Sequence, residues 1–173
     1  SGNHISICGT IESFGRKICV DFSYNRTFTS SKNIALSGSW TKNMRPDYTF
    51  SLWPADFSPA DAEAQELMVH VHFDAKYRVD YLTDLFGGDD ADEEEKQEQR
   101  GTWKRADLLK MHAYRDAIRR TQGAYILYPG NDSAARFKGF HEVLPGLGAF
   151  VLKPGVGDSD IVKFINDVVV HVC

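Results

Sequence analysis

The sequence of 173 residues lacks several features that would place it in a specialised class of protein. Its three cysteines are widely spaced, which argues against a disulfide framework and favours the cytosol. No Cys-x-x-Cys pair indicates structural zinc, and no apolar run approaches the ~20 residues of a membrane span. No secretory signal is visible in the given sequence, which starts with the polar residues Ser1-Gly2-Asn3. No motif supports Ser/His/Asp or Cys/His catalysis, and Gly146-x-Gly148 is too short a match for a glycine-rich phosphate loop.

What is present is the composition of an ordinary globular domain. The hydrophobic fraction of 42% and the charged fraction of 25% are typical of such domains, and 173 residues suffice to bury a core. We therefore expect a single domain over residues 1–173. Because the chain begins with Ser1-Gly2 rather than methionine, we also expect it to be the C-terminal fragment of a longer protein.

The negative charge is concentrated in one segment. Residues 89–98 contain seven acidic residues and one lysine, a local net charge of -6 within a chain of net charge -4. Subtracting the segment leaves about +2 on the rest of the chain, which gives weak support for a phosphate-binding surface. The surrounding Gly- and acid-rich range, residues 87–101, is predicted to be a flexible, solvated loop.

The most informative stretch runs from Val69 to Arg78. Apolar and polar residues alternate strictly there, which is the pattern of a β-strand with one buried face. Asp74 and Lys76 share the second face, together with His70 and His72. An acid that can hold a divalent metal next to an ammonium group suits chemistry on a phosphodiester.

The remaining pattern predicts an α/β fold, with a sheet flanked by helices. Pro46 should mark the start or edge of a strand, and Gly123 is the expected end of a helix. Predicted strands cover residues 16–28, 39–53, 67–78, 124–128 and 149–152, with a strand or loop at 4–11. Helices are predicted at 107–120 and 161–172, with a short helical turn opening at Ser58-Pro59.

Asp47 and Asp74 are the candidate metal ligands. Each lies on the polar face of a predicted strand, and two carboxylates suffice for Mg²⁺, which keeps several waters. Lys76 would orient the attacking water or neutralise charge on the phosphate. The alternative is a surface Asp–Lys pair on an exposed sheet face, and spacing alone favours this alternative.

Two further groups of residues, the histidines of this stretch and a set of basic side chains, are candidates for binding. His70 and Asp74 lie about 13 Å apart along a strand, so the histidines and Asp74 cannot share one ion. We expect His70 and His72 on a polar or DNA-facing surface, with His72 nearer the site. A basic set either tracks a phosphate backbone or forms a solvated helix face; its members are Lys104, Arg105, Lys110, Arg115, Arg119, Arg120, Arg136 and Lys138.

Several ordered motifs resemble a known family. Arg45-Pro46-Asp47 followed by Phe73-Asp74-Ala75-Lys76-Tyr77 resembles the signature of the PD-(D/E)XK nuclease superfamily. Residues 107–114 resemble the helix that carries Gln-x-x-x-Tyr in the RecB-like branch. Residues 124–130 and 144–150 resemble the strands that follow this helix in McrC-type restriction nucleases.

The resemblance implies a restriction-endonuclease-like core with a mixed central β-sheet. It implies a DNA endonuclease in the bacterial or archaeal cytoplasm, acting in restriction and phage defence with an McrB-like AAA+ nucleotide-hydrolysing motor, and compatible with homo-oligomers. The cofactor would be Mg²⁺, with Mn²⁺ as a substitute. Its ligands would be Asp47, Asp74 and the backbone carbonyl of Ala75, and the catalytic residues would be Asp47, Asp74, Lys76, Lys110 and Tyr114.

The sequence departs from the family pattern in two places. Lys110 stands where the motif has glutamine, although Lys110 and Tyr114 still share a helix face. Glu12 is the only nearby candidate for the acidic residue that the family often carries upstream. Two rival functions therefore stay open: a catalytically inactive nuclease-fold module for DNA binding or assembly, and a nuclease directed at RNA.

Overall fold

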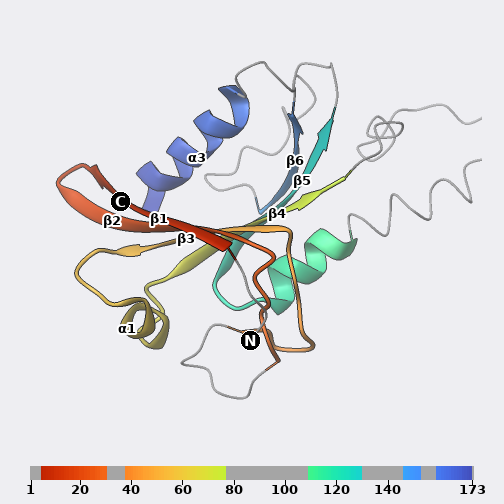
Figure 1. Cartoon of the computed structure of the whole chain (residues 1–173), viewed down its shortest axis with the longest axis horizontal. Coiled ribbons are helices and arrows are strands. Elements are labelled where there is room, and N and C mark those ends of the chain that lie inside the picture. The colour runs from red at the N-terminus through yellow and green to blue at the C-terminus, as the bar shows by residue number, and fades with distance from the viewer. Residues whose placement is uncertain (1–4, 31–37, 77–108, 130–145, 153–158, 173) are drawn as a thin grey trace, which may run out of the picture.

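The computed structural model describes residues 5–30, 38–76, 109–129, 146–152 and 159–172, which form one mixed six-stranded sheet (Figure 1). The strands lie side by side in chain order. The first four pair antiparallel, whereas β4, β5 and β6 pair parallel. Their bounds are β1 Ile5–Ser13, β2 Arg16–Tyr24, β3 Tyr48–Pro54, β4 Val69–Ala75, β5 Thr121–Pro129 and β6 Leu147–Leu152.

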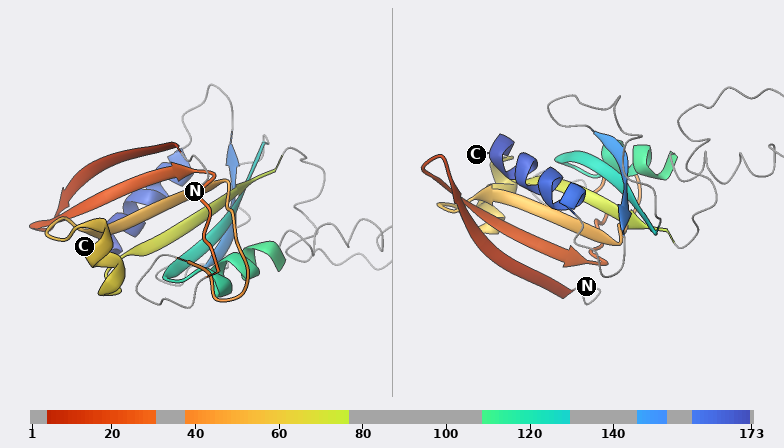
Figure 2. Two further views of the ribbon diagram at one scale, coloured as in Figure 1. Left: turned by 60° about the horizontal axis from the view of Figure 1, so that its bottom comes forward. Right: turned by 90° about the horizontal axis from the view of Figure 1, so that it is seen from above.

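Helices cover both faces of the sheet, as the predicted α/β fold requires (Figures 1 and 2). Helix α3 (Ser159–Val172) packs on one face through Val168 and Val169. The helix that includes residues 109–117 packs on the other face, together with Phe28 and Met44. In the part of the chain that the structure describes, no helix is long and apolar enough to cross a membrane.

Helix α1 (Pro59–Ala64) begins where the Ser-Pro pair predicts it. Proline occupies the first turn, and the Ser58 hydroxyl accepts a hydrogen bond from the backbone N–H of Asp61 at 3.1 Å. Ala62 packs with Trp53 and Met68 in a small apolar cluster beneath the sheet. This packing turns Glu63 inward, so that its side chain is buried.

Several predicted boundaries need correction. The strand predicted over 67–78 runs only from Val69 to Ala75 within the described residues, so Lys76 follows it. The strand that begins at Arg16 ends at Tyr24, because Asn25 takes a left-handed conformation with φ 57°. The strand predicted over 39–53 begins only at Tyr48. The helix predicted over 107–120 ends at residue 117, within the described range, and Arg120 adopts φ 60°.

Gly123 does not terminate that helix. It lies inside β5, where a Cβ atom would come 2.6 Å from the hydroxyl of Tyr125. The glycine therefore makes room for an aromatic side chain two residues along the same face. The predicted acidic loop, residues 87–101, lies outside the described residues.

The second face of β4 is buried, which contradicts the expectation of a polar or DNA-facing surface for its histidines. His70 and His72 are completely buried, and the ring of Phe28 packs edge-on against both. His72 exchanges hydrogen bonds with the hydroxyls of Thr49 and Thr121, each at 3.0 Å. The periodicity identified the residues on this face, but Phe28 comes from a loop and covers it from outside the strand.

A buried charged cluster lies at the start of this face. Glu63 accepts a hydrogen bond from Arg120 at 2.8 Å, and its other oxygen lies 3.8 Å from Arg26 and 3.4 Å from His70. Arg119 is also buried, with its guanidinium 4.4 Å from the ring centroid of Trp40. Arg119 and Arg120 therefore belong neither to a phosphate-tracking surface nor to a solvated helix face.

Replacing Glu63 should strongly destabilise the protein. Glu63→Ala leaves the guanidinium of Arg120 buried without its carboxylate, and breaking a buried pair in this way costs about 3–5 kcal/mol. Urea unfolding would measure the loss. Asp56→Ala removes an exposed acid next to the same helix and should cost less than about 0.5 kcal/mol. Equal losses in the two variants would contradict the structural role of the cluster.

The buried histidines should make stability depend on pH. Burial lowers the pKa of His70, against the attraction of Glu63, and lowers that of His72 well below its ordinary value. The unfolded chain, with histidine pKa values near 6.5, then binds protons that the folded protein does not. The free energy of unfolding should therefore fall as the pH drops below about 6.5, by up to about 1.4 kcal/mol per pH unit for each histidine.

Urea unfolding at pH 7.5, 6.5 and 5.5 checks this prediction. His72→Gln should lower stability at pH 7.5 and reduce the pH dependence, whereas the exposed control His171→Gln should keep the full dependence. A wild-type stability that stays constant from pH 7.5 to 5.5 would contradict it.

Candidate functional site

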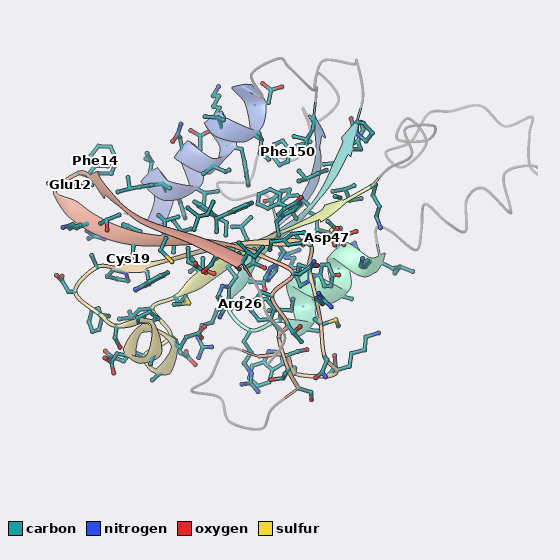
Figure 3. All side chains as sticks on the ribbon, in the orientation of Figure 1. Glu12, Phe14, Cys19, Arg26, Asp47 and Phe150 are labelled. Carbon is teal, nitrogen blue, oxygen red and sulfur yellow. The ribbon has the colours of Figure 1, made fainter. Side chains whose placement is uncertain are left out.

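The register of two antiparallel strands brings Asp47 to Asp74. Tyr48 at the start of β3 pairs with Phe73 near the end of β4, so the next position along places Asp47 opposite Asp74. The Asp47 carboxylate accepts a hydrogen bond from the backbone N–H of Ala75 at 2.7 Å. The pairing thus brings together two acids from distant parts of the sequence at one end of the β3–β4 pair; Figure 3 labels Asp47 at this end of the sheet.

Asp74 carries a buried charge between two lysines. Its side chain is 1% exposed, with Oδ2 2.8 Å from Lys76 Nζ and Oδ1 2.6 Å from Lys110 Nζ. Lys76 follows directly after the last residue of β4, whereas Lys110 comes from the helix that packs over this face. The alternative of a surface Asp–Lys pair on an exposed sheet face does not describe this arrangement, because the carboxylate is inaccessible to bulk water.

Tyr114 lies one turn along the helix from Lys110 and is buried. Its hydroxyl donates a hydrogen bond to the backbone carbonyl of Arg45 at 3.0 Å. Burial raises the pKa of Tyr114 far above its ordinary value, and the charges of Asp74 and Asp47 raise it further. The phenol therefore stays protonated and acts as a donor that holds the segment before β3 against the helix.

The donor atoms at this edge fit a hard divalent cation. Asp47 and Asp74 supply carboxylate oxygens, which Mg²⁺ and Mn²⁺ prefer. Asp74 Oδ2 is buried, and its contact with Lys76 lacks hydrogen-bond geometry, so none of the described residues satisfies it with a hydrogen bond. Among the described residues, no three His, Cys, Asp or Glu side chains gather into a metal cluster. Two carboxylates completed by water and phosphate match this donor set.

The histidines are poor candidates for metal ligands. Both ring nitrogens of His72 take part in hydrogen bonds with threonine hydroxyls. His70 interacts with Ser51 through Nδ1, at 2.9 Å, and its Nε2 faces Glu63. These partners fix both rings within the core and leave the site to the two aspartates.

Glu12 does not join the site. It pairs with Lys17 next to the β1–β2 turn, whereas Tyr48, the neighbour of Asp47, pairs with Tyr24 at the far end of β2. Tyr24 lies seven steps along the strand from Lys17, which corresponds to about 23 Å. Figure 3 shows Glu12 and Phe14 far from Asp47 along the sheet.

Sequence reasoning missed the backbone groups that hold the site together. These are the N–H of Ala75, the carbonyl of Arg45 and the N–H of Asn25, which donates to the Asp47 carbonyl at 2.8 Å. Backbone groups carry no residue-type signal. One signal was available in the sequence at Asn25, because asparagine is common at left-handed turn positions, and Asn25 has φ 57°.

Among comparisons of the chain with family models, curated proteins and solved structures, the family models give a match. Neither the curated proteins nor the solved structures include a match to the chain. The family model of the PD-(D/E)XK nuclease superfamily does match, over residues 4–133, and that range contains both aspartates, both lysines and Tyr114. Because the match covers well over half of the sequence and includes every residue of this site, the chain belongs to the PD-(D/E)XK nuclease superfamily.

Proposed function

We propose that this chain is a metal-dependent DNA endonuclease domain that hydrolyses phosphodiester bonds. The observation that carries the proposal is the buried Asp74 carboxylate beside Lys76 and Lys110, with the Asp47 carboxylate held by the N–H of the next residue, Ala75. A buried acid flanked by ammonium groups combines a cation-binding oxygen with positive charge for a phosphate. The family match supports the same chemistry.

Asp47, Asp74 and the backbone carbonyl of Ala75 would hold Mg²⁺, or Mn²⁺ in its place. Such an ion supplies Lewis-acid polarisation of the phosphate and lowers the pKa of a bound water. The N–H of Ala75 holds the Asp47 carboxylate in position at 2.7 Å. The rigid strand pair thus presents its ligands without a large rearrangement.

The lysines would serve the phosphate. Lys76 lies close enough to Asp74 to orient a water molecule between the carboxylate and the substrate, and to neutralise charge that develops on the phosphate oxygens. Lys110 adds a second ammonium group from the facing helix. Tyr114 positions this helix through its hydrogen bond to Arg45.

The wider setting is a further part of the proposal. The motifs at 124–130 and 144–150 resemble McrC-type restriction nucleases, which favours DNA as substrate, a restriction and phage-defence role, and an McrB-like AAA+ motor partner. This setting would be the cytoplasm of a bacterium or archaeon, and homo-oligomers are compatible with it.

A second candidate function is a nuclease-fold module without turnover that binds DNA or serves as an assembly platform. The ion pair between Lys110 and Asp74 favours it, because the ammonium group contacts at 2.6 Å an oxygen that a metal would use. The lysine also replaces the amide of the motif that it resembles.

Cleavage assays separate these functions. Incubated with plasmid DNA and Mg²⁺ or Mn²⁺, the wild-type protein should nick or linearise the plasmid, whereas Asp74→Asn and Lys76→Ala should reduce the rate by at least about 100-fold, since each removes a group that acts in the transition state. Lys163→Ala, an exposed lysine on α3, provides the matched control. Circular dichroism would verify that each variant is folded.

The pattern of rates decides between the candidates. Equal rates in the wild type and both site variants would remove the catalytic assignment. Retention of DNA in a gel-shift assay without cleavage in either metal would favour the non-catalytic module. Faster cleavage of RNA than of DNA in a parallel assay would redirect the proposal to an RNA nuclease.

A further inference from the structure

We propose that Lys110 makes metal binding depend on DNA: its ammonium group neutralises Asp74 until a DNA phosphate draws it away. The inference rests on the proposed function, since it uses the same two aspartates. It adds a form of regulation to the site. Lys110, which replaces the motif's glutamine, would couple the binding of the metal to the binding of DNA.

Among the described residues of this site, the charges are balanced. Asp74 contacts the ammonium groups of Lys76 and Lys110, and Asp47 is held by the N–H of Ala75 after it, so the two carboxylates and two ammonium groups sum to zero. Cations gain little from entering a neutral site. Moving one ammonium group away would give the site a net charge of -1 and free an oxygen of Asp74.

Lys110 is the lysine that can leave. Its side chain is 42% exposed, compared with 26% for Lys76, and it belongs to a helix rather than to the strand that carries Asp74. Its partial exposure leaves Lys110 accessible to a phosphate backbone. A long flexible side chain in this position can exchange one anionic partner for another with little movement of the backbone.

DNA supplies the competing partner. A phosphodiester carries one negative charge and accepts hydrogen bonds from ammonium groups, so it can replace Asp74 as the partner of Lys110. Asp74 Oδ1 would then be released to the metal. Because binding free energies are reciprocal, DNA would tighten metal binding by the factor by which the metal tightens DNA binding.

Metal affinity measured with and without DNA tests the inference. Mn²⁺ binding would be followed by electron paramagnetic resonance of the free ion, with the site defined as the binding that Asp74→Asn abolishes. A short phosphorothioate duplex at saturating concentration keeps the backbone charge and resists hydrolysis. The proteins compared are the wild type, Lys110→Gln, Lys110→Met, Asp74→Asn and the exposed control Lys163→Gln.

Without DNA, Lys110→Gln and Lys110→Met should bind Mn²⁺ at least about tenfold more tightly than the wild type. This factor is smaller than the one expected from the Coulomb repulsion between the ammonium group and the ion at about 4 Å in the protein interior. The repulsion is weakened because Lys110 is partly solvated. Lys163→Gln should match the wild type. With the duplex, the wild type should bind Mn²⁺ more tightly than it does alone. The affinity advantage of the Lys110 variants over the wild type should then shrink to less than about threefold.

Three results would overturn the inference. If the Lys110 variants bind Mn²⁺ as the wild type does while Asp74→Asn loses the site, the coupling is wrong and the proposed metal site survives. If the gain is equal with and without the duplex, it is a general charge effect rather than an exchange of partners. If Asp74→Asn leaves Mn²⁺ binding unchanged, the proposed metal site itself fails, and the coupling fails with it.

Discussion

The central constraint on this fold is the burial of a carboxylate. Asp74 is almost wholly removed from water, and a buried charge is tolerated only beside compensating cations or a metal. The lysines on either side meet that need, and they come from two different elements. The packing of the helix over β4 and the electrostatics of the site therefore depend on each other. The helix helps to bury Asp74, and through Lys110 it also supplies one of the positive charges that Asp74 needs.

A second buried carboxylate, Glu63 of α1, lies against the other end of the same face of β4. There Glu63 meets Arg120 and Arg26, and the two neutral histidines separate this cluster from Asp74. The choice of cation differs between the ends. Arginine holds a carboxylate through a planar fork and stays charged, which suits a fixed structural contact, whereas lysine is a compact charge on a flexible stem. The arginine end of the face therefore suits a fixed structural contact, and the lysine end suits the proposed exchange of partners.

The sequence predicted much of the architecture because it depends on local periodicity. Alternation predicted that Asp74 and Lys76 lie on one side, and the two form an ion pair although Lys76 follows the end of β4. Helical spacing placed Lys110 beside Tyr114, and the Ser58-Pro59 pair marked the start of α1. The burial of that face was not predictable in this way. Periodicity tells which residues share a face, but not whether Phe28 or a distant helix covers it.

The misplaced arginines and glycine have the same origin. Arg119 and Arg120 were expected either to track a phosphate backbone or to lie on a solvated helix face, yet one stacks on Trp40 and the other pairs with Glu63, both far away in the sequence. A local window contains no information about such tertiary partners. Gly123 looked like the end of a helix, but it lies within β5, where it makes room for the ring of Tyr125 two residues along the strand.

The antiparallel pairing of β3 with β4 has a consequence for how this protein can change. Side chains alternate across a strand, so sliding β4 by one residue would turn Asp74 into the apolar layer beneath α3 and bring Phe73 to the histidine side. The alignment that joins Asp47 to Asp74 is thus the alignment that keeps the hydrophobic layers intact. Substitutions of side chains such as Lys110 can change this site, whereas the register of its two strands is fixed by the packing of the hydrophobic core.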